Sequence, residues 1–211
     1  MQRETVIFSG QGEHADPWHD LPATSAALAD LVGPADIVNE VDELRAALAG
    51  ARLLVVNATA YRLEPVPEDA VFAAAVASFL AEGGGLLAMH SSSVAFPRER
   101  SWRATIGAVW EHGRTFHPEL GPSLVRRTDV AHPIADGLGD FEVIDERYTD
   151  LDLVDDLAPV YAHAGGPAVW AREVGGGRVV YDAFGHDVRS YESAGHAALV
   201  RSAAAWLRGA H

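Results

Sequence analysis

The stretch AEGGGLLAMHSSSV, residues 81–94, decides the fold class of this chain. Its three glycines separate a helix-like segment from the apolar run Gly85-Leu-Leu-Ala-Met89, which is typical of a strand buried on both faces. Strands of this kind belong to parallel sheets that helices cover on both sides. The polar residues from His90 to Ser93 mark the exit of the strand, a position where several α/β enzymes place their nucleophile.

The same alternation of apolar strands and amphipathic helices runs through the first 95 residues. We predict strands at 5–9, 36–41, 52–57 and 85–89, and helices at 22–32, 42–49 (with Asp42 as N-cap) and 67–81. In the less regular second half we predict strands at 123–128, 141–144 and 158–163, a hairpin of 168–174 and 178–184, and a closing helix at 194–207. The pattern predicts an α/β fold in one domain spanning 1–211, with a doubly wound, mostly parallel sheet and a β-hairpin near the C-terminus.

Composition and charge narrow the classes of function. The 211 residues are 48% hydrophobic and carry a formal net charge of -14, which repels a nucleic-acid backbone and suits neutral ligands or cations. There is no cysteine, which excludes disulfides, thiolate nucleophiles and cysteine-based zinc sites. No apolar run approaches the roughly 20 residues that span a bilayer, and the first residues lack the pattern of a signal peptide. We therefore expect a cytoplasmic protein with no nucleic-acid or membrane partner.

Polar residues follow several of the predicted strands. In a parallel sheet the carboxyl ends of the strands meet at one edge, where loops and helix N-termini bind ligands. We predict a polar pocket at this edge, formed by His14, His90, His117, Glu146 and His186. In this pocket, His90, Glu146 and His186 are the predicted catalytic residues. The predicted substrate-binding residues are His14, Ser91, His117, Tyr148 and Asp187.

Two kinds of chemistry fit such a pocket. His90, His186 and Glu146 could hold zinc or another divalent metal with an open position for water. Without a metal, the same residues could act as general acid and base. The residues alone leave two alternatives to this pocket open. In the first, His14 only sits in a loop and His117 only caps a turn. In the second, Ser91 is a nucleophile that His186 activates.

A nucleotide cofactor is not expected. Gly10-Gln-Gly12 follows the first predicted strand, but position 15 is Ala, so the third glycine of the dinucleotide-binding motif is missing. Gly83-Gly-Gly85 precedes its strand, which is the wrong side for a loop that cradles phosphates.

Several short motifs occur together in one order along the chain. They are Gly84-Gly-Leu-Leu-Ala-Met-His90, Phe116-His117-Pro118, His132-Pro-Ile-Ala-Asp-Gly-Leu138, Asp145-Glu-Arg-Tyr148, Pro167-Ala-Val-Trp-Ala-Arg172, Gly177-Arg-Val-Val-Tyr181 and Gly185-His186-Asp187. This ordered set resembles the ThuA-like (trehalose utilisation) family of the class I glutamine amidotransferase-like superfamily, over residues from about 5 to 207. The resemblance implies a flavodoxin-like, class I glutamine amidotransferase-like fold.

The resemblance also implies a changed site. His90 takes the turn that holds the catalytic Cys in glutamine amidotransferases, and His186 resembles the histidine of their triad, so glutaminase activity is not expected. Members of the family are linked to sugar catabolism, which implies a small-molecule carbohydrate or keto-sugar ligand. The three serines after His90 depart from the small residues, such as Ala, that are usual there.

These observations predict an enzyme related to sugar catabolism that acts on a carbohydrate derivative through its His/Glu pocket, as a metal-dependent hydrolase or an isomerase. Trp18, Trp102 or Trp110 could stack on a pyranose ring. The alternatives are a non-catalytic carbohydrate-binding or scaffold module, and a serine hydrolase that uses Ser91. The chain could also form a homo-oligomer.

Overall fold

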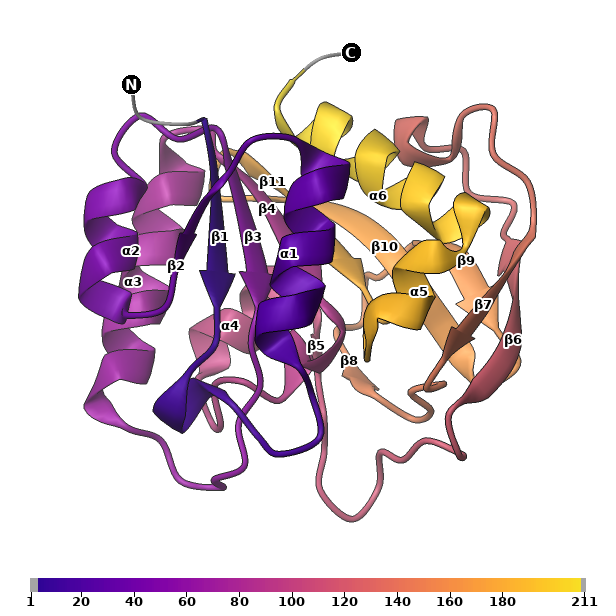
Figure 1. Cartoon of the computed structure of the whole chain (residues 1–211), viewed down its shortest axis with the longest axis horizontal. Helices are drawn as coiled ribbons and strands as arrows, with labels where there is room; N and C mark the ends of the chain where they lie inside the picture. The colour runs from indigo at the N-terminus through magenta and orange to yellow at the C-terminus, as the bar shows by residue number, and fades with distance from the viewer. Residues whose placement is uncertain (1–3, 210–211) are drawn as a thin grey trace.

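Five parallel strands form one side of a nine-stranded sheet in the computed structural model, which describes residues 4–209 (Figure 1). Across the sheet they are β2 (Asp36–Val38), β1 (Thr5–Ser9), β3 (Leu53–Asn57), β4 (Gly85–Met89) and β11 (Gly177–Asp182). All of their pairings are parallel. Every residue of β1, β3 and β4 is buried, as expected for strands covered on both faces.

Four more strands extend this sheet beyond β11. In order they are β10 (Gly166–Val174), β9 (Pro159–His163), β6 (Gly121–Arg127) and β7 (Phe141–Asp145). Each successive pairing is antiparallel, so β10 and β6 run opposite to the five parallel strands, while β9 and β7 run in the same direction as them. The carboxyl end of β7 therefore points to the same edge as the carboxyl ends of β4 and β11.

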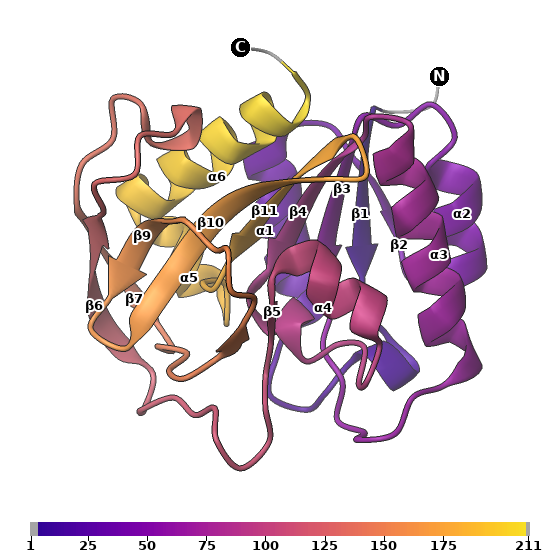
Figure 2. The same ribbon diagram turned by 180° about the vertical axis from the view of Figure 1, so that it is seen from behind.

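Helices cover both faces of the sheet. On one face, α1 (Leu21–Val32), α5 (Val188–Glu192) and α6 (Ala194–Leu207) pack against one another (Figure 1). On the other face lie α3 (Pro67–Ala81) and α4 (Arg100–Ile106), with α2 (Val41–Ala47) beside α3 (Figure 2). The short elements are 3₁₀ turns at Gly12–His14, His90–Ser93 and Pro133–Ala135, and a small sheet of β5 (Ala108–Val109) and β8 (Asp152–Leu153). Among residues 4–209, no helix is both long and apolar enough to cross a bilayer.

The first residues of α3 show how the sequence determines where a helix begins. Pro67 occupies the first helical position, where a missing N–H breaks no helical hydrogen bond. The carboxylate of Asp69 accepts a hydrogen bond from the N–H of Val66 at 3.1 Å and so satisfies a free donor of the first turn. Phe72 and Val76 are buried in the core against the sheet, and this burial holds the helix in place.

The predicted α/β fold is confirmed, and β4, α3 and α6 have the predicted bounds. The predicted hairpin is present as the antiparallel pair of β10 and β11, with Val174 opposite Gly177. The prediction of a strand at 36–41 is wrong at its end, because β2 stops at Val38 and Val41 begins α2. The predicted N-cap is also wrong, since Glu40 and not Asp42 occupies that position.

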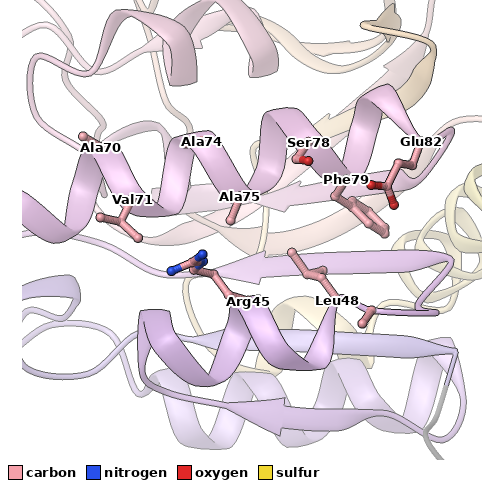
Figure 3. Close-up of a pocket in the computed structure, with 10 residues that line it drawn as sticks. Arg45, Leu48, Ala70, Val71, Ala74, Ala75, Ser78, Phe79 and Glu82 are labelled. Atoms are coloured by element: carbon pink, nitrogen blue, oxygen red, sulfur yellow. The ribbon is translucent and has the colours of Figure 1, made fainter.

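A groove of about 700 Å³ lies between α2 and α3 (Figure 3). Leu48 and Phe79 form part of its apolar lining, with Arg45 and Glu82 as its charged members. It has no histidine in its lining, and the cluster of histidines described below belongs to another cavity. This groove is therefore not the candidate site.

Candidate functional site

The turn after β4 presents His90 in an unusual backbone conformation. Its φ angle is +38°, which residues other than glycine rarely adopt, and the residue is 1% exposed. Its Nδ1 lies 2.7 Å from the carbonyl oxygen of Ala183. Because a carbonyl oxygen only accepts, Nδ1 carries the proton, and in the neutral ring Nε2 has the lone pair. Tyr148 stacks on this ring with a centroid separation of 4.2 Å.

Glu146 lies among three imidazoles just after β7. Its Oε2 is 3.5 Å from His90 Nε2 and 3.3 Å from His186 Nδ1, and its Oε1 is 3.4 Å from His117 Nδ1. Burial alone would raise the pKa of Glu146, but His186 and His90 hold that pKa well below its ordinary value, so the side chain is ionised. Burial would lower the pKa of His186, yet its pairing with Glu146 raises that pKa overall.

Asp145, the last residue of β7, ties this strand to the loop that carries His186. Its Oδ2 accepts a hydrogen bond from the N–H of Gly185 at 2.7 Å. Its Oδ1 accepts from the N–H groups of Glu146 at 2.8 Å and of His186 at 3.3 Å. Gly185 has a φ of +125°, and a Cβ at this position would lie 2.5 Å from the hydroxyl oxygen of Tyr191. The ends of β7 and β11 are therefore held together, which places Glu146 beside His186.

His19 joins this cluster, although sequence reasoning missed it. Its Nδ1 lies 2.9 Å from both carboxylate oxygens of Asp16. Its ring centroid is 4.7 Å from that of His186 and 5.2 Å from that of His90. One donor atom from each of His19, His90, Glu146 and His186 lies within 4.8 Å of the others, so these four residues could hold a metal ion.

A signal for His19 is present in the sequence. The loop from the end of β1 to the start of α1 contains Asp16-Pro-Trp-His19, a carboxylate three residues before an imidazole. Exit loops of parallel strands gather at one edge of the sheet, so any histidine in this loop was a candidate. Only the fold decides which of the two loop histidines, His14 or His19, reaches the cluster.

The cluster opens onto a cleft of about 720 Å³. Its lining consists of Asp16, Trp18, His19, Thr59, Ala60, Tyr61, Leu63, Val94, Trp110, His112, His117, Glu146, Tyr148 and His186. Trp18 and Tyr61 are 61% and 69% exposed and meet edge to face, with ring centroids 5.1 Å apart. The cleft thus joins exposed aromatic rings to a buried polar cluster.

The sequence of the chain matches one known family. A sequence model of the family described as "ThuA: Trehalose utilisation" matches residues 5–207. The chain belongs to the ThuA family. The resemblance drawn from the sequence motifs is thereby confirmed, and membership indicates a role related to sugar catabolism. Among curated proteins, none matches.

Solved structures share the fold of this ThuA-family chain at low sequence identity. A ThuA-like protein from Parabacteroides merdae ATCC 43184 has a TM-score of 0.79 at 15% identity, over 98% of this chain and 90% of that one. A cytoplasmic protein from Salmonella typhimurium LT2 has a TM-score of 0.63 at 12% identity, over 96% and 99%. A protein from Thermoplasma acidophilum that is described as part of a GMP synthase has a TM-score of 0.61 at 13% identity, over 98% and 94%. The likeness shows the fold alone, and that fold is the predicted ThuA-like and amidotransferase-like one.

Of the substrate-binding residues predicted for this ThuA-family chain, His117 and Tyr148 line the cleft and His14 does not. His14 is 5% exposed, and its Nε2 lies 3.0 Å from Asp69 Oδ1. Asp69 also pairs with Arg62 at 2.6 Å. This network joins the loop after β1 to the start of α3, so the contacts of His14 are those of a structural residue and not of the predicted pocket.

Ser91 and Asp187 also lie outside the lining of the cleft. Ser91 is 1% exposed, and its hydroxyl donates to the carbonyl oxygen of Ala58 at 3.2 Å. Asp187 is the N-cap of α5 and accepts from the N–H of Arg189 at 2.9 Å. Within residues 4–209, the hydrogen bonds of Ser91 do not include His186, so the structure gives no support to a serine nucleophile.

The three tryptophans that could stack on a sugar lie in different parts of the structure. Trp18 and Trp110 line the cleft of this ThuA-family chain. Trp102 is 2% exposed and packs in the core, with its ring centroid 5.5 Å from that of Phe72 and 5.0 Å from that of Phe96. Only the first two can meet a ligand in the cleft.

Proposed function

We propose that this ThuA-family protein is an enzyme that acts on a neutral carbohydrate or keto-sugar derivative in the cleft. The observation that carries the proposal is the meeting of exposed aromatic rings and an imidazole–carboxylate cluster in one cavity. Ligand pockets commonly combine apolar faces with a few polar groups that fix orientation. The trehalose-utilisation description of the family supports a sugar as the ligand.

The aromatic rim provides a surface on which a sugar can stack. Trp18 and Tyr61 are large side chains that remain mostly exposed, and exposed apolar surface at the rim of a cavity is typical of a ligand-binding groove. The C–H faces of a pyranose pack on aromatic rings, while its hydroxyls bind polar groups. The net charge of -14 favours a neutral sugar over a phosphorylated one.

The polar cluster provides the chemistry. Without a bound metal, the ionised carboxylate of Glu146 can accept a proton from a sugar hydroxyl or from water, and His186, whose pKa the pairing with Glu146 raises, can donate one. His117 pairs with the other oxygen of Glu146 and also lines the cleft. The absence of cysteine supports the expectation that glutamine is not hydrolysed, because no glutamyl thioester can form.

Titration with a panel of neutral mono- and disaccharides and their keto derivatives, followed by tryptophan fluorescence and calorimetry, tests the proposal. We expect Trp18→Ala to weaken binding of the best sugar at least about tenfold, because it removes a stacking face. Phe116→Ala is the matched control, since Phe116 is 52% exposed and lies outside the lining of the cleft. Absence of binding across the panel, or an equal loss in both variants, would contradict the proposal.

Measurement of sugar turnover distinguishes an enzyme from a non-catalytic binding module. Glu146→Gln keeps the size of the side chain and removes its charge, so we expect sugar binding to persist while turnover falls at least about a hundredfold. Product formation is followed by carbohydrate chromatography. A wild-type protein that binds a sugar and converts no member of the panel would favour the binding module over the enzyme.

We also propose a cytoplasmic location. A protein of the same fold from Salmonella typhimurium LT2 is described as cytoplasmic, which supports this placement. Fractionation of cells that express the native gene tests it, because recovery outside the cytoplasmic fraction would contradict the proposal.

A further inference from the structure

Three buried ring nitrogens near the cleft have no hydrogen-bond partner. They are His19 Nε2, His90 Nε2 and His186 Nδ1, and they are three of the eight such side-chain atoms found among residues 4–209. Native proteins leave few buried polar atoms unpaired, because each costs free energy. Their gathering around the single carboxylate of Glu146 indicates a shared partner.

The opposite nitrogens of two of these rings fix where the lone pairs lie. His90 Nδ1 donates to the carbonyl oxygen of Ala183 at 2.7 Å, and His19 Nδ1 donates to the carboxylate of Asp16 at 2.9 Å. With the proton held at Nδ1, the neutral ring presents a lone pair at Nε2. Histidines that bind metals are held in this manner, by a carbonyl or carboxylate at the nitrogen that faces away from the ion.

The spacing of the donor atoms fits a metal ion. A tetrahedral zinc ion with bonds of about 2.0–2.1 Å separates its ligand atoms by about 3.4 Å. Glu146 Oε2 lies 3.5 Å from His90 Nε2 and 3.3 Å from His186 Nδ1. All four donor atoms, including the one from His19, lie within 4.8 Å of one another. The remaining oxygen of Glu146 faces His117, which keeps the carboxylate oriented.

We propose that His19, His90, Glu146 and His186 bind one divalent transition-metal ion, with zinc as the best fit. Three imidazoles and one carboxylate suit zinc and its transition-metal neighbours, whereas magnesium and calcium prefer oxygen ligands. Asp16 orients His19 without touching the ion.

The site deepens the proposed function and rests on it for its role, although metal binding itself needs no sugar. His19, Glu146 and His186 line the cleft, so a ligand in the cleft can reach the ion. An ion of this class held by these four residues would supply Lewis-acid chemistry to a sugar carbonyl or to water in the cleft.

Calorimetric titration of EDTA-treated, dialysed protein with zinc chloride tests the proposal, with magnesium chloride as the comparison. We expect one zinc ion per chain with a Kd of about 1 µM or tighter, and no magnesium binding in the same range. Cobalt(II) in place of zinc is expected to give the visible absorption of a nitrogen- and oxygen-ligated site. Absence of a one-to-one zinc isotherm in the wild-type protein would overturn the proposal.

Zinc titration of single-residue variants tests which side chains form the metal site. His19→Ala is expected to weaken zinc binding at least about a hundredfold, and Asp16→Ala about ten- to a hundredfold, because the orienting carboxylate is lost. His112→Ala is the matched control, since His112 is an exposed histidine that lines the same cleft outside the cluster. Circular dichroism checks that each variant is folded, and a His112→Ala loss equal to that of His19→Ala would overturn the assignment.

The sugar titration distinguishes failure of this site from failure of the proposed function. Sugar binding by protein that binds no zinc would overturn the metal site alone. Zinc binding by protein that binds no sugar of the panel would support the metal site and contradict the proposed function.

Discussion

The Nδ1 of His90 lies 2.7 Å from the carbonyl oxygen of Ala183, and this contact joins the exits of two neighbouring strands. β4 and β11 pair in parallel, and their last residues, Met89 and Asp182, lie side by side. The ring reaches the carbonyl from a backbone with a φ of +38°. The orientation of the imidazole therefore depends on a conformation that glycine adopts more easily than histidine.

Substitution of His90 separates backbone strain from side-chain contacts. His90→Gly and His90→Ala both lose the hydrogen bond to Ala183 and the stacking on Tyr148. The φ of +38° is unfavourable for alanine but not for glycine. We therefore expect His90→Gly to be more stable than His90→Ala, with a free energy of unfolding higher by about 1 kcal/mol in urea denaturation. Both variants should bind zinc at least about tenfold more weakly than the wild type. A less stable glycine variant would show that the turn is not strained.

Gly185 and Gly166 form a matched pair for the loop that carries His186. Their φ angles are +125° and +127°, so alanine is strained at both positions, by about 1–3 kcal/mol. A Cβ at Gly185 would also lie 2.5 Å from the hydroxyl of Tyr191, whereas a Cβ at Gly166 has nothing within 4 Å. We expect Gly185→Ala to be the less stable variant in urea and to bind zinc more weakly, because its loop must shift. Equal stability and equal zinc affinity in the two variants would contradict this account.

His14→Ala tests whether this histidine supports the fold or the ligand. The substitution leaves the buried carboxylate of Asp69 without one of its hydrogen bonds, so we expect the free energy of unfolding to fall by about 1.5–3 kcal/mol. Sugar and zinc affinity should change by less than about twofold, since sites without shared partners behave independently. Unchanged stability with weakened sugar binding would instead assign His14 to the substrate, as the sequence predicts.

A second buried pair, His196 and Asp182, should make stability depend on pH. His196 Nε2 lies 3.0 Å from Asp182 Oδ2, and its Nδ1 lies 3.0 Å from both the carbonyl oxygen and the hydroxyl oxygen of Ser190, so the ring faces two acceptors that favour its protonated form. Burial would lower the pKa of His196, but the charge of Asp182 raises it above its ordinary value of 6.5. A raised pKa stabilises the fold below pH 6.5, and this contribution is lost as the pH rises through the folded-state value.

Urea denaturation from about pH 6 to about pH 9 measures this effect. The free energy of unfolding of the wild type should fall with pH more steeply than that of His196→Gln, which has no titrating ring at this position. Parallel pH profiles for the two proteins would show that His196 is neutral in the folded state.

The elements that the sequence predicts best have strong local signals. Three glycines and a following polar run bound β4, and Pro67 starts α3, so their limits follow from neighbouring residues. The end of β2 is harder, because Val41 is as apolar as a strand residue and its helical state depends on packing against the core. The region of α4 lacks a clear period, and its position depends on Trp102, which is buried against α3.

The residues of the candidate site also differ in how well the sequence predicts their positions. His90 and His186 follow strands that pair with each other, so their meeting can be predicted from the order of elements. His14 and His19 lie five residues apart in one loop, and local pattern does not distinguish them. The choice between them depends on Asp69, which holds His14 from 55 residues away and leaves His19 to face the cleft.

The link between Asp145 and the N–H of Gly185 also sets a time order for the protein as it is made. His19 and His90 leave the ribosome early, but Glu146 meets them only after β9, β10 and β11 have been synthesised and the last strand has joined the sheet. A nascent chain that ends before residue 186 has an incomplete set of donor atoms. The proposed metal site would then become complete only after nearly the entire polypeptide has been synthesised.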